Sequence, residues 1–162
     1  MSGPFSSPLN IPAPDTPVAS GTVDCGPFWP DVDLNKLRAA MRIDQAVTAE
    51  RLRDVARNAV IDIMAELDSW KREREVEGAA TLNDVSGRYA VDGMSDYVIR
   101  WHRAIQSVIA ADLADRQLGQ SARSAGVERV EELSVDIDIH RRNVAYAVRD
   151  FLGRTRIIAE VI

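Results

Sequence analysis

The sequence predicts an all-α fold: an antiparallel bundle of three long helices and one short helix, with an extended N-terminal arm and an extended C-terminal tail. All seven prolines lie in the first 30 residues, and none follows them. Three later stretches place apolar residues at the spacing of an amphipathic helix. We therefore divide the chain into an arm (1–27), a helical bundle (28–153) and a C-terminal segment (154–162).

The composition is that of an acidic globular protein. The 162 residues give room for one domain with appendages, and they are 46% hydrophobic and 28% charged with a net charge of −5. No run of 18 apolar residues could cross a bilayer, and the start has no secretion signal. We expect a soluble protein that is not exported and has no membrane contact. A single cysteine, Cys25, excludes an internal disulfide and fits a reducing compartment.

The N-terminal arm is rich in proline, serine and glycine, and its apolar residues occur singly. Such a segment buries too little surface to offset the entropy of ordering it, so we expect residues 1–27, with Cys25, to be extended and mobile. Two interpretations stay open: a disordered tail, or an arm that orders in the groove of a partner. Four aspartates and no basic residue lie before residue 34, so residues 34–162 carry only −1 of the net −5.

The junction between arm and bundle reads Phe28, Trp29, Pro30, and we expect these residues to pin the arm to the body or to a neighbouring copy. Asp33 has the residue type of an N-cap for a short helix from Leu34 to about residue 42. A metal site formed with Asp31 is the alternative interpretation, but two carboxylates supply too few oxygen ligands for a divalent ion.

The second helix should begin after Thr48, its N-cap, and run from residue 49 to about residue 77. Its apolar stripe comprises Leu52, Val55, Ala56, Ala59, Val60, Ile63, Met64, Leu67 and Trp70. Gly78 is a natural stop. Residues 78–94 contain three glycines and predict a helical turn followed by a short extended piece.

The third helix should span residues 95–118 and the fourth residues 127–152, with glycine following each. The inward positions are Val98, Trp101, Ile105, Val108, Ile109 and Leu113, then Val130, Leu133, Ile137, Val144, Val148 and Phe151. The final stretch, "RTRIIAEVI", is strand-like. It could add a strand to a partner's sheet edge, with Ile157, Ile158, Val161 and Ile162 filling pockets, or fold back on its own bundle.

Catalytic chemistry is not indicated. His102 and His140 are single histidines on separate helices, and Cys25 lacks an activating environment. Phosphate loops, nucleophile elbows and metal-ligating clusters do not occur in the sequence. We therefore expect a protein that is not an enzyme, with no catalytic residues, no metal and no cofactor.

Several stretches resemble a known family. "FWPDVD" (28–33), "RAAMRIDQ" (38–45) and "RLR" (51–53) carry the likeness, and "TLNDV" (81–85), "RAI" (103–105) and "GRTRII" (153–158) extend it more weakly. Together they resemble the head-completion protein (GPL) family of temperate contractile-tailed phages. Two departures are that Leu34 stands where the pattern has proline, and that the arm matches only in character.

The resemblance implies a structural protein at the head–tail neck of a virion, assembled in the cytoplasm of the bacterial host. Family members dock under the portal ring after DNA packaging, complete the head and retain the DNA until the tail joins, as rings of about twelve copies whose protomers meet through two different faces. The implied partners are portal, neighbouring copies, neck or tail-completion proteins, and DNA passing without sequence recognition. The residues expected to contact the portal are Arg154, Arg156, Ile157, Ile158, Val161 and Ile162.

Two other functions compete with this one. The first is a helical DNA-binding packaging or regulatory protein, because five arginines gather in the first two predicted helices: Arg38, Arg42, Arg51, Arg53 and Arg57. Glu50 and Asp54 interrupt this basic face. The second is a small enzyme whose site is completed between subunits.

Overall fold

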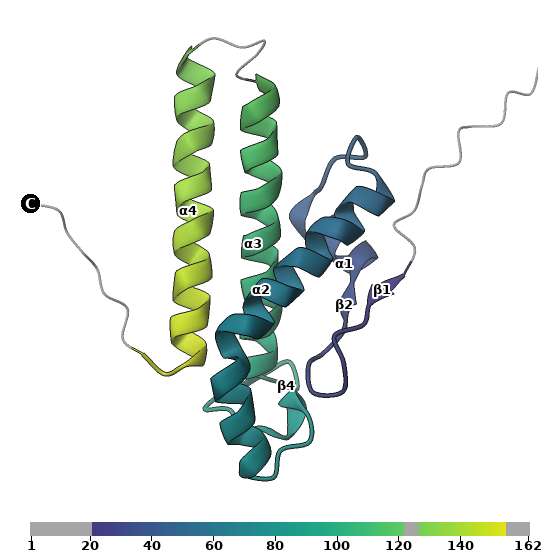
Figure 1. The fold of residues 1–162 in the computed structure, drawn as a ribbon, viewed down its shortest axis with the longest axis vertical. Helices are drawn as coiled ribbons and strands as arrows, with labels where there is room; N and C mark the ends of the chain where they lie inside the picture. The colour runs from purple at the N-terminus through teal and green to yellow at the C-terminus, as the bar shows by residue number, and fades with distance from the viewer. Residues whose placement is uncertain (1–20, 122–126, 155–162) are drawn as a thin grey trace, which may run out of the picture.

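The computed structural model describes the backbone of residues 21–121 and 127–154, and the side chains of these ranges except 117–121 and 127–136. Four α-helices dominate: α1 (Leu34–Met41), α2 (Ala49–Val76), α3 (Asp96–Ser121) and α4 (Val127–Phe151). Helices α3 and α4 form a long antiparallel hairpin, and α2 crosses α3 obliquely (Figure 1). The predicted helical bundle is thus confirmed in outline, with α2 inclined rather than parallel to its neighbours.

The helix boundaries fall within a few residues of the expected ones because the sequence carries their start and stop signals. The Asp33 carboxylate caps α1 by accepting hydrogen bonds from the backbone N–H groups of Asn35 (2.9 Å) and Lys36 (3.0 Å). Thr48 caps α2 through its hydroxyl, which accepts from the N–H of Arg51 at 3.3 Å. Arg42 ends α1 in the left-handed conformation, with φ of 51°.

The core lies where α2, α3 and the C-terminal turns of α4 meet. From α2 it takes the predicted stripe, except that Met64 is only half-buried. Of the inward positions expected in α3, Val108 and Leu113 are also half-buried. Trp101, Leu52, Ile63 and Phe151 are among the largest fully buried side chains. Their removal from water supplies the main driving force for packing the helices, as for other buried apolar side chains.

Residues 21–27, which we expected to belong to a mobile arm, are instead part of the folded body, and this corrects the sequence prediction. Strand β1 (Thr22–Val23) pairs antiparallel with β2 (Val32–Asp33), with Thr22 opposite Asp33 and Val23 opposite Val32. Val23 and Cys25 are buried while Asp24 between them is exposed, which is the alternation of an extended chain on a core. The prediction that Cys25 lies in a mobile arm is therefore wrong. We call residues 21–33 the N-terminal strap; residues 1–20 lie outside the described residues.

The connection between α2 and α3 contains the predicted turn and extended piece. A 3-10 turn, η1, spans Leu82–Asp84, and strands β3 (Ala90–Val91) and β4 (Met94–Ser95) form a hairpin. Its two loop residues, Asp92 and Gly93, have positive φ angles of 51° and 75°. That is the conformation a tight two-residue hairpin loop requires. Within the described ranges, no helix is long and apolar enough to cross a membrane.

Candidate assembly site

The centre of the molecule is an aromatic cluster around Trp29 of the strap. Its indole stacks on that of Trp101 with ring centroids 4.4 Å apart and planes 11° from parallel. Trp70 of α2 lies at 6.3 Å and Phe151 of α4 at 6.0 Å from Trp29. Phe28 meets Trp29 edge to face at 4.9 Å. The strap thus contributes a ring to the junction of three helices.

The backbone of this segment is also tied to the core. The indole N–H of Trp101 donates to the carbonyl oxygen of Pro30 at 2.9 Å, and the N–H of Leu82 donates to that of Phe28 at 2.8 Å. Phe28 is 2% exposed and Trp29 6%. The structure therefore brings Phe28, Trp29 and Pro30 together with α2, α3, α4 and η1 of their own chain, which fixes the point from which the preceding residues depart.

The aspartates at positions 31 and 33 serve the same local structure. One carboxylate oxygen of Asp31 accepts from the backbone N–H of Cys25 at 3.1 Å. The N–H of Lys36, with that of Asn35, stabilises the ionised carboxylate of Asp33 and lowers its pKa below the ordinary value. No group of three or more His, Cys, Asp or Glu side chains within the described part of the chain could hold a metal ion. Both carboxylates thus have structural partners.

The lower end of α4 is held in place next to the start of α3. Arg100 donates to the carbonyl oxygen of Asp150 and forms an ion pair with Asp96 at 3.2 Å. Phe151 packs edge to face on Trp70 at 4.7 Å. Gly153 then takes a positive φ of 64°, and the N–H of Arg154 donates back to the carbonyl oxygen of Arg149 at 2.9 Å. The C-terminal segment consequently leaves the body from a fixed position.

Of the residues predicted to contact a portal, only the first is described. Arg154 is exposed at the foot of α4. The others lie outside the described residues: Arg156, Ile157, Ile158, Val161 and Ile162.

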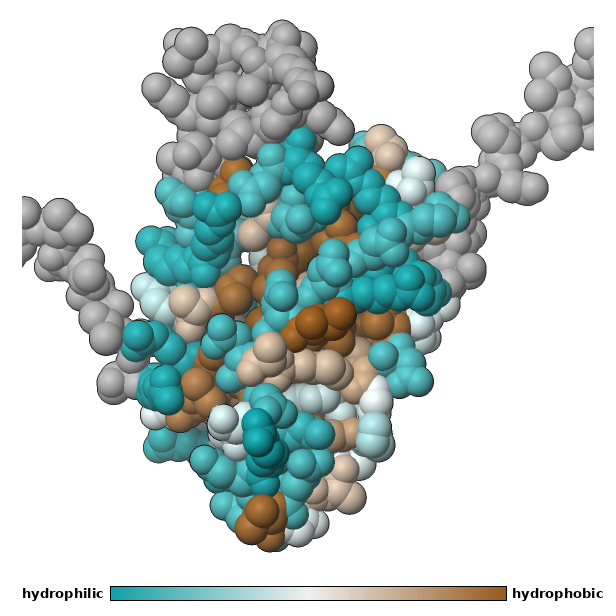
Figure 2. All heavy atoms as spheres, in the orientation of Figure 1, coloured by the Kyte–Doolittle hydropathy of each residue, from teal (hydrophilic) through white to brown (hydrophobic). Residues whose placement is uncertain are grey.

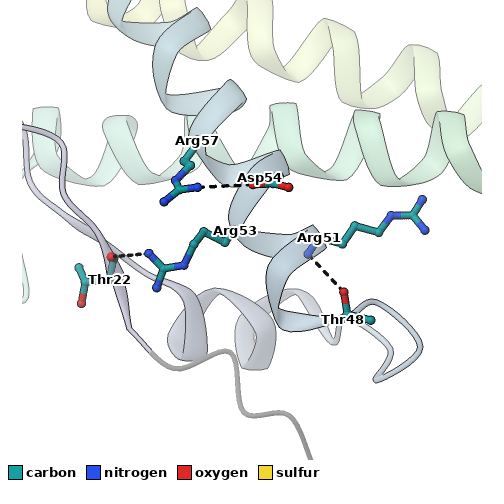
Figure 3. A network of polar contacts seen from close by, with 6 residues as sticks. All are labelled: Thr22, Thr48, Arg51, Arg53, Asp54 and Arg57. Carbon is teal, nitrogen blue, oxygen red and sulfur yellow. Dashed lines mark hydrogen bonds and ion pairs between the residues drawn. The ribbon is translucent and has the colours of Figure 1, made fainter.

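The arginines of the first two helices do not form a free basic face. Arg38 donates to the carbonyl oxygens of Asp44 (2.9 Å) and Val47 (2.6 Å) and so closes the loop between α1 and α2. Arg53 donates to the carbonyl oxygen of Thr22 in the strap at 3.4 Å, as Figure 3 shows.

In the same view Arg57 pairs with Asp54 at 3.5 Å (Figure 3). Three of the five arginines therefore have partners in their own chain. This arrangement weakens the argument for DNA binding, which needs basic groups that are available to phosphates.

The histidines provide no centre for chemistry. His102 is half-buried and lines a pocket of about 410 Å³ together with Asp33, Lys36 and Met94. Burial lowers its pKa below the ordinary value, and the positive charge of Lys36 adds to the effect. His140 is half-buried on α4.

Sequence reasoning missed how completely the aromatic residues converge. Six of the nine aromatic side chains in the chain, including all three tryptophans, belong to one cluster. The available signal was that the tryptophans lie at the strap, at the end of the α2 stripe and in the α3 stripe, each on an inward face. The hydrogen bond from Arg100 to the Asp150 carbonyl oxygen had no signal in the sequence, because it joins residues 50 positions apart.

These features define a class: a small helical structural protein whose core fixes the points from which both chain ends leave. A family model, "Phage head completion protein (GPL)", matches residues 23–162. The chain belongs to that family. The match begins at Val23, where the strap first contributes a buried residue.

A relative from Escherichia phage P2, described as a head completion/stabilization protein, is 30% identical over 162 residues. That alignment covers 100% of this chain and 93% of the relative. No solved structure matches the chain.

Proposed function

We propose that this protein is a structural head-completion protein that docks as a ring beneath the portal after DNA packaging, stabilises the filled head and prepares it for the tail. Membership of the head-completion family supports the general role. In the assembled particle it is a virion component at the head–tail neck, put together in the host cytoplasm. It acts by binding and not as an enzyme, without a cofactor.

The observation that carries the docking proposal is the fixed exit of the C-terminal segment. Arg100 and Phe151 hold the last turn of α4, so Arg154 is presented from a rigid base. An extended segment on such a base binds with a smaller orientational cost than one attached to a loose end. Arg154 and Arg156 pair with acidic groups of the portal. Pockets or a sheet edge on the portal receive the aliphatic residues Ile157, Ile158, Val161 and Ile162.

A ring requires two different faces that meet between neighbours, with a rotation that closes. Exposed apolar side chains suited to such contacts occur on separate parts of the body: Ile61, Val76, Tyr89, Val91 and Met94. A ring of about twelve copies would match the symmetry expected of a portal. The net charge of −5 suits a channel that DNA passes without sequence recognition, because phosphates are repelled. Neck or tail-completion proteins then bind the opposite side.

The test measures mass in solution by light scattering, for the protein alone and mixed with portal rings of the same phage. We expect a monomer or small oligomer that joins portal with about one copy per portal subunit. Deleting residues 154–162 should abolish the association while leaving helicity unchanged.

The matched control, Arg142→Glu, changes an exposed arginine on α4 and should bind normally. Undiminished binding of the deletion variant would refute the docking assignment. A chain that ignored portal but bound DNA with a steep salt dependence would support the DNA-binding alternative.

A further inference from the structure

An apolar groove runs between α2, α3 and α4, away from the aromatic cluster. Its volume is about 440 Å³, and its floor includes Ile63 of α2, Val108 and Ala111 of α3, and Val144 of α4. Hydrophobic residues gather in a band between α4 and α2 (Figure 2). The groove exists because α2 diverges from the α3–α4 hairpin above their crossing (Figure 1). Its volume lies within the range of about 300–1,000 Å³ typical of ligand pockets.

One lip of this groove is negatively charged and open to a partner. Asp62 and Glu66 stand one helical turn apart on α2, and both are exposed. Among the described side chains neither has a hydrogen bond or an ion pair. On the other lip Arg141 is already paired with Asp115 at 2.8 Å. The groove therefore favours an aliphatic segment that carries positive charge.

We infer that the occupant of this groove is the chain's own C-terminal segment, residues 154–162. The inference rests on the proposed function, which assigns the same segment to portal. The segment combines Arg154 and Arg156 with Ile157 and Ile158. Its arginines match the carboxylates of Asp62 and Glu66, and its isoleucines match the apolar floor.

The segment is long enough to reach. Val144 in the groove lies seven positions before Phe151, the last residue of α4, a distance of about 10 Å along the helix. The eight residues 155–162 span about 26 Å when extended, so they can fold back along α4 to this level. Val148 on α4 and Leu152, directly after the end of α4, are half-buried apolar residues that lead from the foot of the helix toward the groove. Attachment to the body also gives the segment a high effective concentration at the groove.

The consequence is a competition between groove and portal. One segment cannot fill both, so the groove holds it while no portal is present and releases it when portal binds more tightly. Docking then frees the groove as an apolar surface on the ring. A protein of this design stays apart in solution and assembles on its template.

The test is site-specific photocrosslinking in the full-length protein. A benzophenone amino acid at Ala65, an exposed residue that lines the groove, should attach to the tryptic peptide 157–162. The matched control places the same probe at Ala39, which is exposed on α1. We expect the product at Ala65 at several times the yield at Ala39, and within one chain when light and isotope-labelled proteins are mixed. Equal yields, or products joining light to heavy chains, would overturn the inference.

Exchange of the charges provides a second test of the groove contact. Replacing both groove carboxylates, Asp62→Lys with Glu66→Lys, should lower the yield about five-fold, the effect of two exposed ion pairs. Adding Arg154→Glu and Arg156→Glu should restore it, measured in the tryptic peptide 150–162 because both later cleavage sites are lost. Asp68→Lys, on another face of α2, is the control and should leave the yield unchanged. A crosslinking yield that stays the same when the charges of Asp62 and Glu66 are reversed contradicts the inference.

Portal binding by the same proteins separates the two proposals. A strong groove product in a protein that never binds portal would refute the proposed function and leave the groove contact standing. Portal binding without a groove product would refute the groove contact alone. Where both occur, added portal rings should reduce the groove product as the rings fill, and a product unaffected by bound portal would refute the competition.

Discussion

The indole rings of Trp29 and Trp101 stack at 4.4 Å, and the N–H of the second ring donates to the carbonyl oxygen of Pro30, the residue that follows the first. One side chain of α3 therefore fixes both a ring and a backbone group of the strap. The stack is buried, so its polar atom needs this partner.

Removing the hydrogen bond while keeping an aromatic ring should destabilise the protein moderately. Trp101→Phe should lower the free energy of unfolding by about 1–2 kcal/mol, because the Pro30 carbonyl loses its donor and some contact is lost. Trp29→Ala should cost more, about 3–5 kcal/mol, since it leaves a cavity between three helices. Urea denaturation followed by circular dichroism measures both. The exposed Tyr89→Phe is the control, and an equal effect there would contradict the assignment.

The thiol of Cys25 should be inert in the folded protein. Burial, with the negative charge of Asp31, raises its pKa to about 11, and the thiolate is the reactive form. We expect negligible alkylation by iodoacetamide at pH 8 under native conditions and full alkylation in denaturant, measured by intact mass. Rapid native labelling would show that the strap opens readily.

The neutral form of His102 is favoured by the fold, which gives stability a defined pH dependence. Its pKa is lowered, mainly by burial and then by Lys36, so the unfolded chain binds a proton more readily than the folded one. The stabilising contribution of His102 should therefore be complete at pH values above 6.5, the ordinary pKa of histidine. It should decline as the pH falls through 6.5 toward the lower pKa of the folded state.

His102→Gln should flatten the decline in urea midpoint between pH 7.5 and pH 5, and Lys36→Gln should flatten it partly. The other side chains facing this pocket include the carboxylates of Asp31 and Asp33, which both variants retain. An unchanged pH profile in His102→Gln would refute the role of this residue.

The fold should require glycine at position 87, because there is no room there for a side chain. A Cβ at this position would clash with the carboxylate of Asp96 and lie 2.6 Å from the hydroxyl oxygen of Ser95. Asp96 is 8% exposed and paired with Arg100, so it has little freedom to move away. Gly87→Ala should cost about 1–3 kcal/mol of stability by urea denaturation. Ser86→Ala, at the exposed neighbouring residue, should be close to neutral, and equal losses would point to a general loop effect.

The helices could be predicted because their signals are local. The stripe from Leu52 to Trp70 repeats over many turns, and Asp33 and Thr48 stand directly before α1 and α2. The ordered strap could not be predicted from the sequence. Its two alternating apolar residues, Val23 and Cys25, cannot outweigh a composition typical of disorder. Its burial depends on partners in distant helices.

The candidate site was likewise predictable only in part. Phe28 and Trp29 were notable in the sequence, but Trp101 as their partner follows only from tertiary packing. The groove at Ile63 and Val144 arises from the inclination of α2, which no periodicity encodes. The C-terminal residues from Arg156 onward remain predictions, since they lie outside the described residues.

The aromatic cluster also fixes an order of events during synthesis. Trp29 is among the first of its rings to leave the ribosome, whereas Phe151, 6.0 Å from it in the finished core, is among the last. Trp29 can stack on Trp101 once α3 has been made, but Phe151 covers the cluster only when nearly the whole chain has been translated. Closure of this core is therefore a late step of synthesis, and an isolated N-terminal fragment that ends before α4 lacks the side chain that completes it.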